Sequence, residues 1–274
     1  MKKWRIRFLF ASAVAGAYSF LGGCLARPFC VMERKKNGME MVCWAQACVA
    51  ARGDKLSSYT TYFSEQDKGR CANLRLAAAR IDGIALQPYG ELSFNGVVGP
   101  RTKECGYQTA KVIVEGEFVE GIGGGVCQVS TTLYNAALLA GLQVIEHHAH
   151  SLRVGYVSPS RDAMVTAWCD LRLYNPRSET VYLSAVTGKG YLRVSVHGKS
   201  DGTEYCIESR TIEELPPPEP KIEIGEWEET VREGVWGLRS EAYLKTYRNG
   251  VLLAVKRLRV DEYAPQRGVI RKKI

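Results

Sequence analysis

The sequence predicts an α+β fold in which an antiparallel sheet packs on a central helix that starts at Cys127, followed by a small C-terminal β domain. Three observations support this prediction. After Cys127, apolar residues recur at three- and four-residue steps up to Ala140, as in a buried helix. Between residues 167 and 197, apolar residues alternate with others, as in half-buried strands. Farther on, Asn249-Gly250 separates two apolar runs, which is a strong hairpin signal.

Composition and charge limit the classes of partner. Of 274 residues, 46% are hydrophobic and 24% are charged, which is typical of a chain with a globular core. The formal net charge is +8, and a basic surface suits anionic envelope polymers or a membrane face. Nucleic acid is not expected as a partner, because the chain has no basic helix, zinc pattern or aromatic motif that reads bases.

Residues 1–26 predict a signal sequence or a membrane anchor. Residues 1–7 are basic, and the nineteen residues 8–26 carry no charge, which is just long enough to span a bilayer with the basic end in the cytoplasm. The stretch Leu21-Gly-Gly-Cys24 also resembles a lipobox, which would place a lipid on the cysteine, and a secreted form is a third alternative. All three interpretations place the body of the chain outside the cytoplasmic membrane.

Residues 27–54 are predicted to be a connector with a short helix that carries Cys43 and Cys48. An external protein with nine cysteines can form disulfides, and the odd number is consistent with a free thiol, which we assign to Cys127. No metal or other cofactor is expected, because no histidine lies near Cys43 and Cys48 and their spacing is not that of a zinc knuckle. Three further cysteines are expected to be buried and inert, namely Cys71, Cys105 and Cys169.

The main domain is predicted to cover residues 55–198. Its first half should contain a strand at 59–63, a helix at 70–81, a short strand at 91–95, a loop at 96–102 and an extended run at 106–115. Three residues of this half are candidates for lining a polar cleft, and each also fits a structural role: Ser93, Asn95 and Arg101.

A glycine run leads directly into Cys127. Because the predicted helix ends near Gly141, Cys127 should lie at its first turn, where free N–H groups and the helix dipole favour a thiolate over a thiol. The glycines allow positive φ angles and close approach of another chain segment. The N–H groups of Gly123, Gly124 and Gly125 are also candidates for binding a developing oxyanion.

Three of the four histidines follow in one segment, residues 144–156, which is predicted to be a strand. In a strand, His148 and His150 point to one face and His147 to the other. A cysteine at a helix start with a histidine on a neighbouring strand is typical of a thiol nucleophile and its base. Asp162 is a candidate for orienting that histidine, and a local turn formed by Arg161 and Asp162 is the alternative.

The remaining chain is predicted to be β structure. One hairpin should pair residues 167–174 with 180–186, and a second should add residues 191–197. Residues 199–220, which end in Pro216-Pro-Pro-Glu-Pro220, are predicted to be a stiff linker. Residues 221–274 should then form the small C-terminal β domain.

Several motifs, in the expected order, resemble the VanW family. They are Leu92-Ser-Phe-Asn95, Val98-Gly-Pro-Arg-Thr102, Gly106-Tyr107, Gly123-Gly-Gly-Val-Cys127 with the helix that follows, His148-Ala-His150-Ser151, and Arg161-Asp162-Ala163. The resemblance covers roughly residues 55 to 198, and Asn73 falls within the family signature. At one position the chain departs from the pattern, because His147 stands where the family usually has arginine. Residues 221–274 show a shorter resemblance to the G-five module of surface proteins.

The resemblance implies an enzyme, because some members of the VanW family are peptidoglycan L,D-transpeptidases. By this resemblance Cys127 would accept the acyl group, with His148 or His150 as the base and Asp162 as its orienting group. The expected partners are peptidoglycan stem peptides, and the cytoplasmic membrane through the amino terminus. The candidate substrate-binding and oxyanion residues are Gly123, Gly124, Gly125, Gln128, Ser93, Asn95, Arg101 and Arg161. The alternative hypothesis is a non-catalytic wall-binding protein in which Cys127 is only a packed residue; a metal site formed by Cys127 and the histidines is a weaker third.

Overall fold

The computed structural model describes residues 29–35, 38–44, 53–114 and 116–273. The chain divides into two compact units, residues 1–46 and 47–274. In the first unit, β1 (Phe29–Lys35) pairs antiparallel with β2 (Gly38–Trp44), so the predicted helix at Cys43 is wrong. Cys48 and the predicted anchor 1–26 lie outside the described residues. No helix in the described residues is both long and apolar enough to cross a bilayer.

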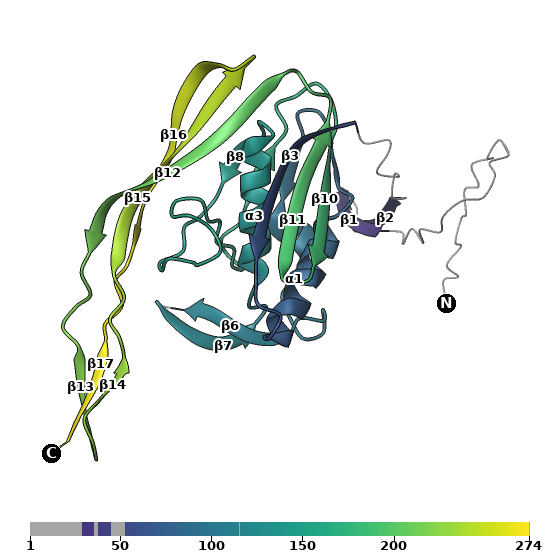
Figure 1. The fold of residues 1–274 in the computed structure, drawn as a ribbon. Helices are drawn as coiled ribbons and strands as arrows, with labels where there is room; N and C mark the ends of the chain where they lie inside the picture. The colour runs from purple at the N-terminus through teal and green to yellow at the C-terminus, as the bar shows by residue number, and fades with distance from the viewer. Residues whose placement is uncertain (1–28, 36–37, 45–52, 115, 274) are drawn as a thin grey trace, which may run out of the picture. The chain divides into compact units, whose positions relative to one another are not determined.

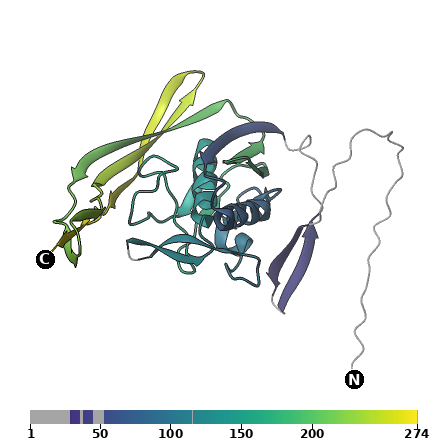
Figure 2. The ribbon, with the colours of Figure 1, turned by 60° about the horizontal axis from the view of Figure 1, so that its bottom comes forward.

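The second unit is built on a four-stranded antiparallel sheet with the order β3-β11-β10-β4. Its strands are β3 (Asp54–Tyr62), β4 (Ala85–Leu86), β10 (Val181–Gly188) and β11 (Tyr191–Gly198). Two helices, α1 (Lys68–Ile81) and α3 (Val126–Leu139), pack against this sheet and against each other (Figures 1 and 2). The α+β prediction agrees with this architecture, in which antiparallel sheets predominate and helices are few.

The central helix α3 is buried along almost its whole length, including its polar residues. Thr132 Oγ1 lies 2.8 Å from Thr61 Oγ1 of β3, and Ser57 Oγ of β3 donates to Ala136 O at 2.6 Å. Because buried polar groups cost free energy unless they are paired, these bonds fix the rotation and height of α3 on the sheet. The start of α3 is therefore held rigidly.

A second antiparallel sheet has the order β5-β9-β8, formed by β5 (Glu91–Ser93), β9 (Arg172–Tyr174) and β8 (Gln143–Glu146). The predicted hairpin between residues 167–174 and 180–186 is therefore wrong, because β9 pairs with β5 and β8, whereas β10 pairs with β11 and β4. The side chain of Asn175 donates to Leu86 O, Gln87 O and Glu179 O, and so holds the chain between the two sheets.

Two local predictions near these strands also need correction. Residues 94–98 form the short helix α2 (Phe94–Val98), so Asn95 is helical and the predicted loop starts later. Ser93 caps this helix by accepting the N–H of Gly96 at 2.9 Å. The strand predicted at 144–156 ends at Glu146, and the chain from His147 to Tyr156 is irregular.

A two-stranded antiparallel hairpin precedes α3. It consists of β6 (Thr109–Val114) and β7 (Glu117–Ile122) and leads directly into the glycine run. Asn73 of α1 ties this hairpin to the glycine run, because its amide donates to Gln108 O at 2.9 Å and to Gly124 O at 3.0 Å. Asn73 thus has the loop-tying structural role.

The C-terminal third is a pair of three-stranded sheets. The first, β12-β15-β16, contains β12 (Thr203–Leu215), β15 (Gly237–Arg248) and β16 (Val251–Tyr263), and β12 contacts α3 (Figure 1). The second, β13-β17-β14, contains β13 (Lys221–Gly225), β14 (Glu229–Arg232) and β17 (Val269–Lys273). The hairpin at Asn249-Gly250 is confirmed, with φ angles of 50° and 76°.

The predicted separation of this third from the main domain is not found. Residues 203–215 of the expected linker form β12, and only residues 199–202 and 216–220 of it lack regular structure. Residues 47–274 form one compact unit, and α3 packs on β12. The C-terminal sheets therefore reach the main domain closely enough to contribute to its site.

Candidate active site

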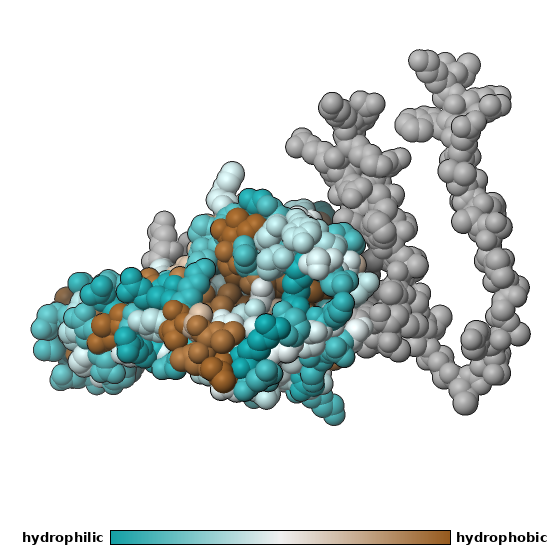
Figure 3. Space-filling model, turned by 90° about the horizontal axis from the view of Figure 1, so that it is seen from above, coloured by the Kyte–Doolittle hydropathy of each residue, from teal (hydrophilic) through white to brown (hydrophobic). Residues whose placement is uncertain are grey.

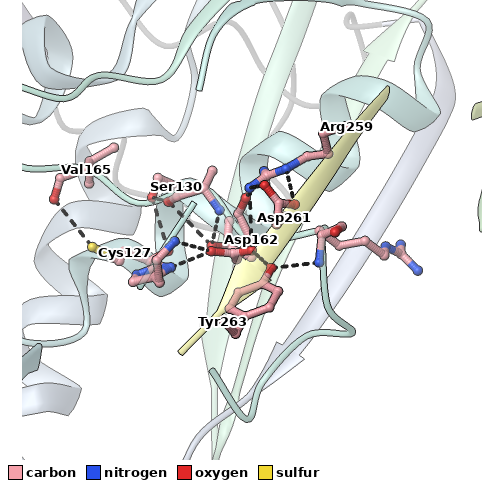
Figure 4. A network of polar contacts seen from close by, with 12 residues as sticks. Cys127, Ser130, Asp162, Val165, Arg259, Asp261 and Tyr263 are labelled. Atoms are coloured by element: carbon pink, nitrogen blue, oxygen red, sulfur yellow. Dashed lines mark hydrogen bonds and ion pairs between the residues drawn. The ribbon is translucent and has the colours of Figure 1, made fainter. Parts of the chain in front are cut away.

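Cys127 lies in the first turn of α3, as predicted. Gly125 is the N-cap and has a φ of 103°, a left-handed conformation that glycine adopts without strain. The side chain of Cys127 is half-buried, and its Sγ lies 3.4 Å from the carbonyl oxygen of Val165 (Figure 4). Because Cys127 lies in this first turn, the positive end of the α3 dipole favours its thiolate, whereas the N–H groups of Val126 and Gln128 already bond Gly123 O and Gly125 O.

His150 and Asp162 form the buried polar pair beside this thiol. Asp162 Oδ2 accepts two hydrogen bonds from His150, one from the backbone N–H at 2.8 Å and one from Nδ1 at 2.6 Å. Asp162 is completely buried and His150 is 5% exposed. Because Nδ1 is engaged by the carboxylate, Nε2 is the ring nitrogen that serves Cys127. The chain thus arranges thiol, imidazole and carboxylate in the order of a catalytic triad.

The charges of these three groups reinforce one another. Burial alone lowers the pKa of His150, but its bonds to Asp162 and Cys127 outweigh that effect and raise the pKa to about 9. Burial raises the pKa of the Cys127 thiol, whereas the hydrogen bond and charge of His150 bring it below its ordinary value. Burial likewise opposes ionisation of Asp162, yet His150 and Arg259 hold its pKa at about 2. These directions favour a thiolate–imidazolium pair near neutral pH.

The glycine run is packed tightly against its neighbours. A Cβ on Gly124 would lie 2.5 Å from Lys111 O of β6, and one on Gly123 would lie 3.1 Å from Cβ of Arg101. Gly123 also has a φ of 86° and uses its N–H to bond Gln108 O at 3.1 Å. One role of these glycines is therefore to let the turn before α3 pack closely against β6 and Arg101. An oxyanion role for Gly123, Gly124 and Gly125 stays a prediction.

Ser93, Asn95 and Arg101 belong to one network at the edge of the site. Arg101 Nη2 donates to Asn95 Oδ1 at 2.5 Å, and its Nη1 donates to Thr166 O at 3.1 Å, next to the carbonyl that faces the thiol. Ser93 Oγ donates to Asp170 Oδ2 at 2.5 Å. Burial raises the pKa of Cys127, whereas His150, a backbone hydrogen bond of Val165 and the positive charge of Arg101 lower it. Arg101 thus acts on the thiol electrostatically, while Ser93 supports the loop.

Both polar atoms of the Gln128 side chain bond to neighbouring residues of the described chain. Its Oε1 accepts from Arg70 Nη2 at 2.7 Å, and its Nε2 donates to Thr61 Oγ1 at 3.0 Å and to Tyr62 O at 2.9 Å. Gln128 therefore orients Arg70 in the cleft wall, and its predicted contact with substrate stays a prediction.

Three other residues singled out in the sequence lie apart from the thiol. His148 Nε2 pairs with Glu146 Oε1 at 3.0 Å near the surface, whereas His150 interacts with Cys127. His147 stacks on Tyr134 with ring centroids 5.5 Å apart, and burial lowers its pKa to about 4. Arg161 donates from Nε to Asn135 Oδ1 at 2.9 Å and does not line the cleft.

A cleft of about 1060 Å³ opens over Cys127 and His150. One wall is the β6–β7 hairpin, through residues such as Ile113 and Phe118. Four cationic side chains line the cleft, namely Arg70, Arg101, Lys111 and Arg153. In the described residues no aspartate or glutamate lines it, and none of these four cations has a carboxylate ion pair. The cleft therefore suits a ligand with negative charge.

Two functional neighbours were missed by sequence reasoning. Tyr263 of β16 donates its hydroxyl to Asp162 Oδ1 at 2.5 Å, and Arg259 Nη1 donates to Asp162 O at 2.7 Å (Figure 4). Arg259, Asp261 and Tyr263 alternate along one strand and so share one face. This alternation of polar side chains along a predicted strand is the sequence signal that could have indicated these residues. Elsewhere, no group of three His, Cys, Asp or Glu in the described residues is placed to hold a metal ion.

Comparison with known proteins gives a family match over the region that contains Cys127, His150 and Asp162. The family described as VanW like protein matches residues 69–197, which include the thiol, the imidazole and the carboxylate. Residues 69–197 are therefore the part of the chain that is similar to this family. Outside this part lie β3 and the C-terminal sheets.

Two curated relatives are similar to part of this chain. The chain is 41% identical over 145 residues to the Bacillus subtilis protein YoaR, covering 52% of this chain and 48% of that protein. It is 27% identical over 110 residues to the Vancomycin B-type resistance protein VanW of Enterococcus faecalis, covering 38% and 40%. The chain thus spans less than half the length of either relative. One solved structure, the crystal structure of HP0197-G5, matches 25% of this chain at 21% identity, and 97% of its own length is covered. Its TM-score of 0.15 is too low to support a statement on fold.

Proposed function

We propose that the chain is a cell-envelope cysteine acyltransferase that forms a thioester at Cys127 and cross-links peptidoglycan stem peptides, as an L,D-transpeptidase does. The observation that carries this proposal is the buried His150–Asp162 pair beside the half-buried Cys127, under an open cleft. A structural cysteine has no need of an imidazolium and a fully buried carboxylate, which cost free energy to bury. Such clusters of groups with shifted pKa values are typical of catalytic sites.

The chemistry follows from the charge states. The Cys127 thiolate attacks the carbonyl carbon of the donor peptide and forms a tetrahedral oxyanion. In this proposal, backbone N–H groups at the start of α3 stabilise that charge. His150 then gives its proton to the departing amine, leaving a thioester on Cys127. The amine of an acceptor peptide attacks the thioester, His150 takes the proton of that amine, and the thiolate leaves. Water in place of the amine would give a peptidase.

The cleft charges support stem peptides as substrates. Such peptides carry free carboxylates, and the four cations of the cleft have no competing acid among the described residues. Lys111 and Arg153 are exposed and free to reach a ligand, whereas Arg70 is held by Gln128. Long, mobile cations at the rim attract an anionic ligand, and fixed ones orient it. This division favours an extended anionic peptide over a neutral one.

The test is muropeptide analysis. The full chain, as wild type and as Cys127→Ala, is incubated with tetrapeptide-bearing muropeptides, and the products are identified by mass spectrometry. New 3-3 dimers, or trimmed stems, should form with the wild type only. Cys206→Ala is the matched control, because Cys206 is an exposed free cysteine on β12 and should be dispensable. Unchanged substrate with a folded wild-type protein would contradict the proposal.

A non-catalytic role remains the alternative, either in peptidoglycan binding or as an accessory to glycopeptide resistance, to which the name of one relative refers. Trp227, between β13 and β14, and Trp236, just before β15, are each 56% exposed, and exposed aromatic rings are typical of binding surfaces. Saturable binding to purified peptidoglycan that survives Cys127→Ala, with no new muropeptide, would favour this alternative. The proposed anchoring to the cytoplasmic membrane is tested separately by fractionating cells with and without residues 1–26.

A further inference from the structure

The loop at residues 159–162 rests on the C-terminal sheet. Ser209 Oγ of β12 donates to Pro159 O at 2.5 Å, and Ser240 Oγ of β15 lies 2.7 Å from Ser160 Oγ. Ser160 is completely buried and has a φ of 55°, an unusual conformation for a residue other than glycine. Such a conformation persists only where surrounding contacts enforce it. Here two of the enforcing contacts come from β12 and β15.

The third strand of the sheet contacts the catalytic carboxylate itself. The hydroxyl of Tyr263 accepts the N–H of Ser160 at 2.7 Å and donates its one proton to Asp162 Oδ1 at 2.5 Å. Arg259 Nη1 donates to the backbone oxygen of Asp162 at 2.7 Å, while Asp261 holds the other side of the guanidinium at 2.6 and 2.9 Å. Each strand of the sheet thus supplies at least one contact to this loop.

The two carboxylate oxygens of Asp162 have different hydrogen-bond partners. Oδ2 receives both bonds from His150, and Oδ1 receives the bond from Tyr263, with Arg259 Nη2 at 3.8 Å. Because Asp162 is fully buried, water cannot replace a lost partner. A carboxylate fixed at both oxygens cannot rotate away from the imidazole. The orientation of His150 therefore depends on groups that lie 97 and 101 positions after Asp162 in the chain.

We propose that Tyr263 and Arg259 are positioning residues for the Cys127 site, and that the β12-β15-β16 sheet is part of the catalytic unit rather than an independent spacer. This inference rests on the proposed function. Neither residue touches the reacting atoms, and both act through Asp162 on His150. Among the described residues of β16, the half that carries them is the packed half, because Val251 to Arg257 are all exposed. Figure 3 shows apolar patches on the surface seen from above, set among hydrophilic residues.

Two further contacts extend from the same strand to other parts of the site. The N–H of Ala264 donates to the carbonyl oxygen of Ser151, the residue after His150, at 2.8 Å. Gln266 Nε2 donates to Gly116 O in the turn of the β6–β7 hairpin at 3.3 Å. The chain at and after the end of β16 thus contacts the carboxylate loop, the histidine segment and the cleft wall together. A separate spacer domain would not make contacts of this kind.

The test measures the thiol directly and needs no peptide substrate. Tyr263→Phe is made in the full chain, and the rate of Cys127 alkylation by iodoacetamide is followed against pH. Without the hydroxyl, Asp162 holds His150 less firmly, the imidazolium is less favoured, and the apparent pKa of the thiol should rise by about one unit. That rise corresponds to about tenfold less thiolate at a pH below the pKa. In the acyl-transfer assay kcat should fall while KM stays constant.

Controls separate positioning from general damage. Tyr243→Phe removes a hydroxyl from the same sheet that bonds Arg210 at the surface, and it should leave the pH profile unchanged. Arg259→Lys keeps the charge but loses the paired bonds to Asp261, and should raise the thiol pKa by a smaller amount. Thermal melting confirms that each variant is folded.

The outcomes are distinct for the two proposals. Folded Tyr263→Phe and Arg259→Lys proteins with a wild-type alkylation profile would overturn the positioning role. If instead the wild-type thiol were activated and both variants weakened it, but no muropeptide product ever formed, the acyltransferase function would fail and the positioning role would stand.

Discussion

Replacing Asp162 by asparagine tests the electrostatic basis of the site while preserving its size. In the wild type, Oδ2 accepts two bonds from His150 and Oδ1 accepts one from Tyr263. An asparagine has one acceptor oxygen and an NH₂ group that can only donate. The NH₂ group must therefore face donors on one side, and the negative charge between His150 and Arg259 is lost.

The magnitude of the effect follows from the pKa of His150. That pKa stands at about 9 against an ordinary 6.5, a difference of roughly 3 kcal/mol in favour of the imidazolium. Asp162 and Cys127 share this stabilisation, so Asp162→Asn should lower the pKa of His150 by at least one unit. At pH 7 the thiolate population, and with it the rate of Cys127 alkylation, should then fall about ten- to a hundredfold. Breaking a buried ion pair should also lower the free energy of unfolding by about 3 kcal/mol.

The assay is alkylation of the full chain across pH 5 to 10, with denaturant unfolding measured in parallel. Asp170→Asn is the matched control, because Asp170 is a partly buried carboxylate that bonds Ser93 and the N–H of Asn95 but does not contact His150. It should lower stability without moving the alkylation profile. A folded Asp162→Asn protein whose thiol titrates like the wild type would refute the reasoning, because the carboxylate would then have no influence on the thiolate.

Three further predictions concern stability and the cleft. The free energy of unfolding should fall by about 2 kcal/mol between pH 5 and pH 2 through Asp162 alone. The reason is that the pKa of Asp162, about 2, lies below the ordinary 3.8, so the stabilisation by its carboxylate is lost on acidification. Asp162→Asn should flatten this part of the pH profile. Gly124→Ala should cost about 1–3 kcal/mol, since its Cβ would lie 2.5 Å from Lys111 O, whereas Gly155→Ala, with nothing within 4 Å, should be nearly neutral by thermal melting. The double variant Lys111→Glu, Arg153→Glu should raise KM for anionic peptides about tenfold or more. An unchanged KM would argue against an anionic ligand. Alkylation of Cys127 by neutral iodoacetamide is the internal control.

Local patterns predicted the parts of the fold that depend on nearby residues. The spacing of apolar residues after Cys127 gives α3, and the glycines before it give the tight turn into that helix. The Asn249-Gly250 hairpin is equally local, since both residues adopt the positive φ angles that such a turn requires. The placement of the nucleophile at a helix start was therefore available from the sequence.

Pairings set by distant residues were not predictable in the same way. The partner of β9 depends on Asn175, two of whose three side-chain bonds go to Leu86 and Gln87, far away in the sequence. The choice between His148 and His150 depends on where β8 ends, and strand periodicity alone placed both on one face. In contrast, the error over residues 203–215 was avoidable, because this segment has strand-forming residues and the prolines begin only after it.

The dependence of Asp162 on Tyr263 has a consequence for the timing of activation. The two residues are 101 positions apart in the chain. During synthesis from the amino terminus, Cys127 and His150 emerge long before the strand that completes their carboxylate. Contacts of such long sequence separation also form late in folding. We expect the thiol to stay weakly reactive in the nascent chain, so that acyl transfer cannot begin on an unfinished or truncated protein.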